Sequence, residues 1–291
     1  MNTSLPNVGL IGIGLVGKAL AERLLQAGFR VVGFDVEARC VDELVRLGGE
    51  AAASTRAVAQ AADLCLISLP DSAIAGQVLN EIAPQLTGKR VVDTTTGDPA
   101  QSAAVGRQLA KQGIDLLDAT IVGSSKQVRN GEVIVLVGGE ERVFRQCLPV
   151  FSCFARQSFY LGPWGSGARM KLVVNLVLGL NRAVLAEGLA FADACGIQPA
   201  QALEILQSSV AYSRVMDTKG QKMLAHDFSV EAKLAQHHKD VRLILAAAHQ
   251  SGASVPLSMV HDDLLTAAES LGLGEMDNSA IIKVYHKTQT A

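Results

Sequence analysis

Residues 8–18 read Val-Gly-Leu-Ile-Gly-Ile-Gly-Leu-Val-Gly-Lys, an apolar run that passes directly into a glycine-rich turn. Ala19, Leu20, Leu24 and Leu25 follow at helical spacing. A strand, a Gly-x-Gly-x-x-Gly turn and a helix in this order predict a dinucleotide-binding unit, because the glycines permit close approach of a pyrophosphate and the helix N-terminus stabilises its charge. The residues predicted to bind the dinucleotide here are Gly12, Ile13, Gly14, Leu15, Val16 and Gly17.

The second apolar run ends at Asp35, where a carboxylate can accept hydrogen bonds from a ribose diol. Its negative charge repels a 2′-phosphate, so we expect NAD as the cofactor, while Arg39 keeps NADP open. Residues 12–18 also fit a nucleoside-triphosphatase loop. Ala19, however, replaces the hydroxyl residue that holds magnesium there, which disfavours ATP hydrolysis. A turn used only for packing is the remaining alternative, and the surrounding pattern disfavours it.

Val/Ile/Leu-rich runs alternate with stretches of helical period through the first half of the chain, which predicts a parallel sheet covered by helices on both faces. The runs are residues 8–13, 30–35, 63–69, 90–95, 114–122 and 132–137. A last run, residues 159–161, precedes the breaker-rich residues 162–167, and the pattern is helical from Ala168 onward. We therefore expect an N-terminal α/β Rossmann domain over residues 1–163 and an all-α C-terminal domain for substrate binding and oligomerisation over residues 164–291.

The composition predicts a soluble globular protein, since 49% of the 291 residues are hydrophobic and 19% are charged. A net charge of -2 without a basic cluster predicts no nucleic-acid and no membrane partner. The most membrane-like segment, residues 172–192, contains Arg182 and Glu187, so we interpret it as a buried helix. Because its apolar side chains cover nearly all faces, it predicts a homo-oligomer, a dimer or a tetramer.

The 5 cysteines include no Cys-x-x-Cys pair, which is typical of a reducing, cytoplasmic location. Residues 1–6 lack the features of a signal peptide. The adjacent His237 and His238 point to different faces of a helix and have no third ligand at a suitable spacing, so no metal site is expected. The other histidines are interpreted as surface or structural residues: His226, His249, His261 and His286.

Further motifs occur in a fixed order after the glycine turn. They are Ser68-Leu69-Pro70-Asp71, Asp93-Thr94-Thr95-Thr96 before Pro99, Asp118-Ala119 with Gly123, Gly165-Ser166-Gly167 with Lys171 and Asn175, Lys239-Asp240 and Asp277-Asn278-Ser279-Ala280. In these motifs the chain resembles, over nearly its whole length, the β-hydroxyacid dehydrogenases, which include 3-hydroxyisobutyrate dehydrogenases and tartronate or succinic semialdehyde reductases.

The resemblance implies that Lys171 is the catalytic lysine and that Asn175 holds the substrate, a small 3-hydroxy acid or a related semialdehyde. Residues four apart share a helix face, which suits this pair. A lysine exchanges the hydroxyl proton if burial and the cofactor lower its pKa. The structural alternatives are a solvated lysine and an asparagine bonded to backbone. Residues that the resemblance places along the cofactor are Leu69, Pro70, Thr96 and Lys239, with helix capping as an alternative for the threonines of residues 94–96.

One segment departs from the family pattern. The family usually has Asp-Ala-Pro-Val-Ser-Gly-Gly where this chain has Asp-Ala-Thr-Ile-Val-Gly-Ser at residues 118–124. The resemblance implies that this segment binds the substrate carboxylate, so Val122 removes one donor and Ser124 constrains the backbone. Gly123 and the Ser124 amide could form an anion-binding nest, helped by the Ser124 hydroxyl or Lys126. The identity of the substrate therefore stays open.

Two other functions remain as alternatives. Imine reductases share the two-domain plan, but they usually have Asp or Tyr where this chain has Lys171. A non-catalytic dinucleotide-binding protein is favoured by the altered segment at residues 118–124 and disfavoured by the retention of Lys171 and Asn175. Fold alone does not decide between these functions. The sequence favours an NAD(P)-dependent dehydrogenase or reductase acting on CH–OH groups.

Overall fold

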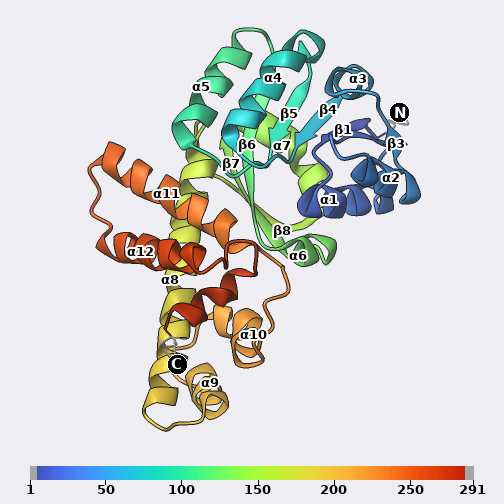
Figure 1. Cartoon of the computed structure of the whole chain (residues 1–291). Helices are drawn as coiled ribbons and strands as arrows, with labels where there is room; N and C mark the ends of the chain where they lie inside the picture. Colours follow the sequence, from blue (N-terminus) through green and yellow to red (C-terminus); the bar gives the residue numbers. More distant parts are fainter. Residues whose placement is uncertain (1–4, 286–291) are drawn as a thin grey trace. The chain divides into compact units, whose positions relative to one another are not determined.

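The computed structural model describes residues 5–285 and divides into two compact units, Met1–Lys171 and Leu172–Ala291 (Figure 1). The breaker residues at 162–167 lie shortly before this division. A domain boundary after residue 163 remains our proposal.

The first unit is built on one sheet with the strand order β3-β2-β1-β4-β5-β6-β7-β8. The strands are β1 (Val8–Ile11), β2 (Val31–Phe34), β3 (Glu50–Ala51), β4 (Leu64–Ile67), β5 (Arg90–Asp93), β6 (Asp115–Val122), β7 (Val133–Gly139) and β8 (Ala155–Tyr160). All predicted apolar runs form strands, and the α/β fold with a parallel sheet is confirmed. The run at residues 159–161 covers only the last two residues of β8 and the residue after it. The exposed, two-residue strand β3 was not predicted, because it has no apolar pattern.

One strand pair is antiparallel, β6 with β7, whereas the other neighbouring strands are parallel. Only residues 123–132 connect β6 to β7. A parallel crossover needs about a dozen or more residues, so this short connection returns the chain in the opposite direction. The sheet is therefore mostly parallel, and the sequence pattern did not predict this one antiparallel pair.

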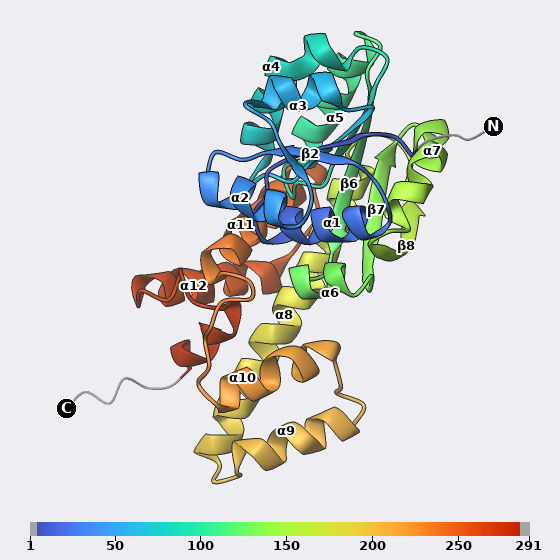
Figure 2. The same ribbon diagram turned by 90° about the vertical axis from the view of Figure 1, so that its right-hand side faces the viewer.

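Helices cover both faces of the sheet, as predicted (Figure 2). One apolar layer joins the sheet to side chains of α1, α2, α6 and α7, and the other joins it to α3, α4 and α5. The helices are α1 (Leu15–Gln26), α2 (Ala38–Arg46), α3 (Thr55–Ala61), α4 (Ser72–Leu86), α5 (Pro99–Ala110), α6 (Ser125–Arg129) and α7 (Glu141–Phe151). The residues of β6 alternate between the layers, because successive strand side chains point to opposite faces.

The second unit is helical, and its described residues, 172–285, form no strand beyond one isolated bridge between Lys233 and Asp277. The all-α expectation is confirmed. Its elements are α8 (Ser166–Ala194, which begins in the first unit), α9 (Pro199–Ser208), the π-helical turn η1 (Met216–Gly220), α10 (Gln221–Leu224), α11 (Leu234–Ser251), α12 (Pro256–Ser270) and the 3-10 turn η2 (Asn278–Val284).

Helix α8 is long and apolar enough to cross a membrane by length and composition alone. Within the second unit, however, Leu185, Ala186 and Leu189 of α8 belong to the apolar core. Asn175 and Arg182 of the same helix are buried as well. Packing inside the second unit therefore accounts for part of the apolar composition of the helix.

Candidate cofactor and active site

The glycine turn between β1 and α1 requires glycine for steric reasons at two positions. Gly12 has φ +91°, and a Cβ there would lie 2.2 Å from the Ser68 carbonyl oxygen. A Cβ on Gly17 would lie 2.0 Å from the Gly12 carbonyl oxygen. Around Gly14, by contrast, no atom lies within 4 Å of the place where a Cβ would be. The turn is thus closed toward the protein at Gly12 and Gly17 and open at Gly14, as a phosphate approaching the backbone requires.

The N-terminus of α1 lacks the cap that most neighbouring helices have. Helices α3, α4, α5 and α6 are each capped by a side chain, from Ser54, Asp71, Asp98 and Ser124. Helix α1 has no side-chain cap and no acidic residue in its first turn. Its N–H groups and helix dipole therefore suit an anion, which fits the pyrophosphate of a dinucleotide.

Asp35 follows β2 and holds the glycine turn in place. Its Oδ2 accepts the Ile13 N–H at 2.6 Å, and its Oδ1 accepts the Glu37 N–H at 2.9 Å. A carboxylate has about four lone-pair sites, so both oxygens can still accept ribose hydroxyls. Arg39, the residue that kept NADP open, lies 3.6 Å from the Glu37 carboxylate. Asp35 and Glu37 therefore place two acidic side chains directly after β2.

Two threonines after β5 bond to the end of β4 and to the loop that follows it. Thr94 Oγ1 donates to the Ile67 carbonyl at 2.8 Å, and Thr95 Oγ1 accepts the Leu69 N–H at 3.2 Å. Asp98 caps α5, so the alternative of threonine capping was wrong. The predicted cofactor residues Leu69, Pro70 and Thr96 lie in these same two loops after β4 and β5, at the edge where open α/β sheets bind ligands.

Lys171 lies beside the predicted substrate segment. Its Nζ donates to the Ile121 carbonyl at 2.7 Å, directly before Val122 and Gly123. The side chain is half-buried, so the alternative of a freely solvated lysine does not describe it. The fold therefore brings together two parts of the predicted site that are 50 residues apart in the sequence.

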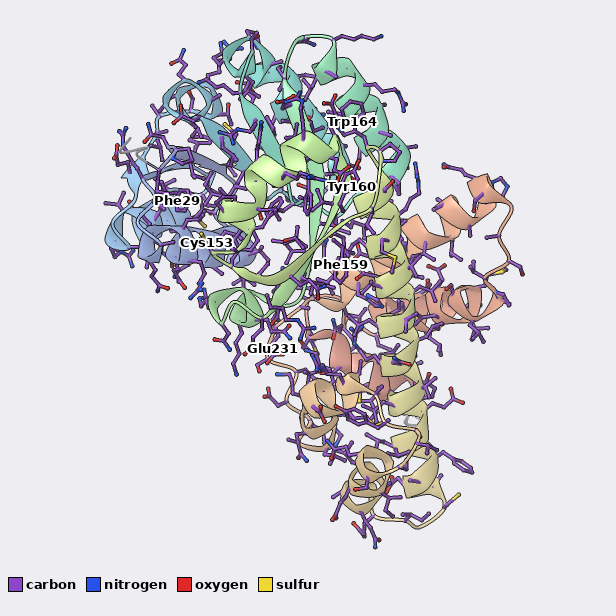
Figure 3. The ribbon with its side chains drawn as sticks, turned by 180° about the vertical axis from the view of Figure 1, so that it is seen from behind. Phe29, Cys153, Phe159, Tyr160, Trp164 and Glu231 are labelled. Atoms are coloured by element: carbon purple, nitrogen blue, oxygen red, sulfur yellow. The ribbon has the colours of Figure 1, made fainter. Side chains whose placement is uncertain are left out.

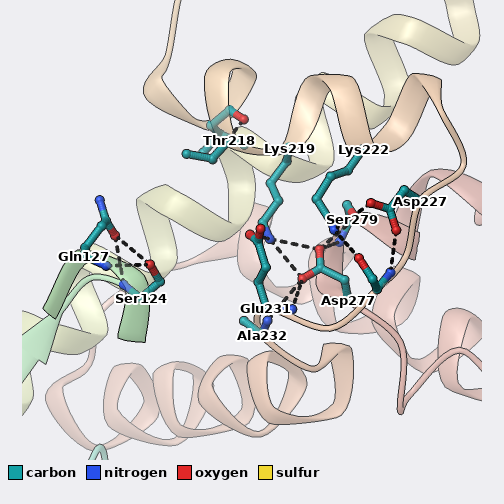
Figure 4. Close-up of polar contacts among 12 residues, drawn as sticks. Ser124, Gln127, Thr218, Lys219, Lys222, Asp227, Glu231, Ala232, Asp277 and Ser279 are labelled. Atoms are coloured by element: carbon teal, nitrogen blue, oxygen red, sulfur yellow. Dashed lines mark hydrogen bonds and ion pairs between the residues drawn. The ribbon is translucent and has the colours of Figure 1, made fainter. Parts of the chain in front are cut away.

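The predicted anion-binding donors of Ser124 are already engaged (Figure 4). The Ser124 N–H donates to Gln127 Oε1 at 2.9 Å, and Ser124 Oγ accepts the Gln127 N–H at 3.3 Å. This reciprocal capping box begins α6. A substrate carboxylate could use the Ser124 amide only after the Gln127 side chain moved. Gln127 was not predicted from the sequence, although Ser-x-x-Gln is a recognisable capping pattern.

Asn175 is paired with a carboxylate within the second unit. Its Nδ2 donates to Asp240 Oδ2 at 2.9 Å, and the two residues are 6% and 8% exposed. The alternative of an asparagine bonded only to backbone was therefore wrong. Lys239 Nζ lies 3.5 Å from Asp240 Oδ1. Asp240 was part of a motif but was not predicted as a site residue; its position next to Lys239 was the available signal.

The adjacent histidines are both buried in α11. His238 Nε2 lies 3.0 Å from Asp262, and its Nδ1 lies 3.1 Å from Glu269. His261 is 3% exposed, and burial, with Arg182 and His238 adding to it, lowers its pKa to about 4. No three side chains among residues 5–285 form a metal-binding group of His, Cys, Asp or Glu. His226 and His249 are exposed, and His286 lies outside the described residues.

Comparison with known proteins places the chain in a family. Residues 7–162 match the NAD binding domain of 6-phosphogluconate dehydrogenase, and residues 165–285 match the NAD-binding domain of NADP-dependent 3-hydroxyisobutyrate dehydrogenase. The 2-(hydroxymethyl)glutarate dehydrogenase of Eubacterium barkeri is 32% identical over 96% of this chain and 95% of its own. The chain belongs to the β-hydroxyacid dehydrogenase family.

Other members agree in sequence and in fold. Glyoxylate/succinic semialdehyde reductase 1 of Arabidopsis thaliana is 31% identical over 95% of this chain and 97% of its own. The solved structure of a 3-hydroxyisobutyrate dehydrogenase from Salmonella typhimurium superposes with a TM-score of 0.88 at 26% identity, over 96% of this chain and 99% of its own. This β-hydroxyacid dehydrogenase family member is an NAD(P)-dependent oxidoreductase that acts on CH–OH groups.

Proposed function

We propose that this family member transfers hydride between nicotinamide and a small 3-hydroxy acid or the related semialdehyde, with Lys171 as the general acid and base. The observation that supports the proposal most strongly is the 2.7 Å hydrogen bond from Lys171 Nζ to the Ile121 carbonyl. This bond holds the ammonium group at the end of β6, next to the segment Val122, Gly123 and Ser124 that we propose to line the substrate.

A nicotinamide dinucleotide held at the glycine turn and Asp35 would supply hydride to a carbonyl or accept it from an alcohol carbon. In the oxidative direction Lys171, in its neutral form, takes the hydroxyl proton as the C–H electron pair leaves, and in reduction the Lys171 ammonium returns that proton to the new alkoxide. Asn175 stands one helical turn later on α8, and its bond to Asp240 fixes the orientation of its amide. We propose that this amide orients the substrate.

The substrate carboxylate needs donors other than the Ser124 amide while Gln127 occupies that amide. We propose that Lys171 and Asn175 supply part of this recognition. The Gly123 backbone has φ +144°, and a Cβ there would lie 2.6 Å from Val133 Cγ1, so this position of the segment requires glycine.

NAD is the proposed cofactor rather than NADP. We propose that the turn Gly12, Ile13, Gly14, Leu15, Val16 and Gly17 holds the pyrophosphate and that Asp35 holds the ribose. Leu69, Pro70, Thr96 and Lys239 are proposed to line the rest of the dinucleotide. The carboxylate of Asp35 supports this preference, because its negative charge repels a 2′-phosphate. The dissociation constants of NADH and NADPH, measured by nicotinamide fluorescence, test it; equal or tighter NADPH binding contradicts it.

The proposed reaction is tested by following nicotinamide absorbance with 3-hydroxy acids, 4-hydroxybutyrate, threonate and, in reverse, the semialdehydes. The variant Lys171→Ala should lower kcat by about 10²- to 10⁴-fold, because it removes the acid and base, while NADH binding is retained. Full activity of Lys171→Ala would remove the proposed role. Turnover of a cyclic imine, but of no hydroxy acid, would instead support the imine reductase alternative. NADH binding without any turnover would support the non-catalytic one.

We also propose that the protein acts as a cytoplasmic homo-oligomer, a dimer or tetramer formed across α8. The five cysteines are free thiols, as expected in a reducing compartment. Helix α8 exposes large apolar side chains, which a partner copy would cover: Val173, Val177, Val184 and Phe191. Light scattering at micromolar concentration tests this proposal, and a monomer would contradict it.

A further inference from the structure

Strand β6 presents a row of polar side chains to the start of α8. Leu117, Ala119 and Ile121 of β6 belong to the apolar layer on one face of the sheet. Asp118 and Thr120 alternate with them and point to the other face, where residues 166–171 of α8 lie. Both side chains are buried, Asp118 being 2% exposed and Thr120 1%. Burial of a carboxylate costs free energy unless hydrogen bonds compensate the lost hydration, so the hydrogen-bond partners of Asp118 have to be identified.

The Asp118 carboxylate caps α8 from 47 residues upstream. Its Oδ2 accepts the Gly165 N–H at 3.1 Å and the Ala168 N–H at 3.0 Å. The first N–H groups of a helix have no partner within the helix, and their dipoles favour a negative charge. Asp118 thus satisfies two of these donors from a neighbouring strand, whereas the caps of α3, α4, α5 and α6 come from the residue directly before each helix.

Three further contacts hold the start of α8 and the residues directly before it against β6 and β7. Thr120 Oγ1 donates to the Gly167 carbonyl at 3.2 Å. A Cβ on Gly167 would lie 2.4 Å from the Leu136 carbonyl oxygen and 2.6 Å from that of Asp118. The backbone of α8 therefore touches the backbone of β6 and β7 without an intervening side chain. Trp164, labelled in Figure 3, adds a bond from its Nε1 to the Leu116 carbonyl at 2.8 Å.

We propose that Asp118 is the positioning residue for Lys171: by fixing the first turn of α8 on β6, it sets the place of the lysine ammonium group at the Ile121 carbonyl. The cap and the ammonium group are anchored to the same strand, three residues apart, at Asp118 and Ile121. Release of the cap lets the start of α8 shift relative to β6. A displacement of about 1 Å can cost about 10²-fold in rate. The proposal rests on the proposed role of Lys171.

The surroundings of Asp118 explain why an aspartate is suited to this place. Burial raises its pKa to about 6, although the Ala168 and Gly165 N–H groups oppose the shift, and Asp93 on β5 adds to it. Asp118 is therefore charged at neutral pH, facing the helix N-terminus. Asp118 Oδ1 packs against Gly138, where a Cβ would lie only 2.2 Å from it. Asp118 Oδ1 has no hydrogen-bond partner among the described residues. One carboxylate oxygen is thus committed to the cap.

The test compares Asp118→Ala with Asp118→Asn. The alanine variant removes the acceptor and should lower kcat by about 10-fold or more, while the dissociation constant of NADH stays within about threefold. The asparagine variant keeps an oxygen that can accept both N–H bonds and should restore most of kcat. Ser54→Ala is the matched control, because it removes the cap of α3, which does not carry Lys171. It should leave kcat unchanged.

A second measurement does not depend on activity. The rate at which an amine-reactive reagent labels Lys171, followed by mass spectrometry, should rise about fivefold in Asp118→Ala, because the bond to the Ile121 carbonyl is weakened. It should stay at the wild-type rate in Asp118→Asn and Ser54→Ala. If Asp118→Ala does not fold, Thr120→Val, which removes only the bond to Gly167, should give a smaller rise of the same kind.

An unchanged labelling rate in Asp118→Ala or, in its place, in Thr120→Val overturns the proposal. The proposal is also overturned if kcat falls in Asp118→Ala and is equally low in Asp118→Asn. It is overturned as well if NADH binding weakens in Asp118→Ala to the same extent as kcat falls. A failure of the proposed function gives a different result. In that case Lys171→Ala stays active, whereas the labelling rate of Lys171 still responds to Asp118.

Discussion

The two units of this protein stabilise their buried polar side chains in different ways. In the first unit Thr94, Asp118 and Thr120 all bond to backbone atoms of a neighbouring strand or helix. In the second unit buried side chains also pair directly with one another, as in Lys219 with Asp277 and Asn175 with Asp240. The difference follows from the backbone. Strand ends and helix starts leave N–H and C=O groups available, whereas the interior of a helix uses them itself.

The ion pair at the centre of the second unit illustrates the second mode (Figure 4). Asp277 is fully buried, and both of its oxygens lie 2.9 Å from Lys219 Nζ. It also accepts backbone N–H groups of Glu231, Ala232 and Ser279. Asp277 therefore fixes the segment that leads into α11, the helix that carries Lys239 and Asp240.

The largest effect on stability is expected from breaking this pair. Asp277→Ala leaves the Lys219 ammonium group buried without its principal partner and should lower the free energy of unfolding by about 3–5 kcal/mol. Replacing both residues, in Lys219→Met/Asp277→Leu, should recover part of the loss, because no charge is then left uncompensated. Urea unfolding of the three proteins measures this. If Asp277→Ala is as stable as the wild type, the ion pair between Lys219 and Asp277 does not stabilise the second unit.

The two units should also respond to pH in opposite directions. Burial raises the pKa values of Asp93 and Asp118 in the first unit to about 6. As pH rises from about 4 to 6, the unfolded chain releases these protons at lower pH than the folded chain does, so the stability of the first unit falls. His261 in the second unit has a pKa of about 4, so the unfolded chain binds its proton first. Stability there falls as pH drops from about 6.5 to 4, by at most about 3 kcal/mol.

Hydrogen exchange followed by mass spectrometry at several pH values, corrected for intrinsic rates, resolves the two units. Protection of residues 172–285 should decrease between pH 7 and pH 4.5, while that of residues 5–171 should hold or increase. His261→Gln, which does not titrate in this range, should flatten the response of the second unit. Parallel loss of protection in both units would contradict the opposite signs.

A smaller effect is expected at the glycine turn. Gly12→Ala forces a residue with φ +91° to carry a Cβ against the Ser68 carbonyl, which should lower the free energy of unfolding by about 1–3 kcal/mol. Gly14→Ala meets no protein atom and should leave stability unchanged while weakening NADH binding. Thermal unfolding and NADH titration separate these effects. Equal destabilisation by both substitutions would contradict the inference that the turn is open at Gly14.

The smallest effect is expected at Gln127. Gln127→Ala removes one half of the capping box of α6 and should cost about 0.5–1 kcal/mol of stability. It also frees the Ser124 amide, so the KM of a carboxylate substrate should fall while kcat changes little. Steady-state kinetics of Gln127→Ala beside Gln127→Glu, which keeps the acceptor, measures this. An unchanged KM in both variants means that the carboxylate does not use this amide.

The sequence by itself determined those strands, helices and turns that depend on neighbouring residues in the chain. The glycine turn with Asp35 and the alternation of apolar runs with helical stretches predicted the α/β unit, because strand and helix periods are visible in the chain. The breaker-rich residues before α8 and the period after them predicted the helical unit. The short strand β3 and the reversed direction of β7 were missed, because pairing direction depends on connection length and not on side-chain pattern.

Only the tertiary structure decided which partners the buried polar groups have. The motifs named Lys171, Asn175 and Asp118, but nothing in the chain indicated that Lys171 bonds to Ile121, that Asn175 bonds to Asp240, or that Asp118 caps α8. These contacts join residues about 50 or more positions apart. A polar side chain takes whichever donor or acceptor the fold brings within hydrogen-bonding distance, and that choice has no signature in local sequence.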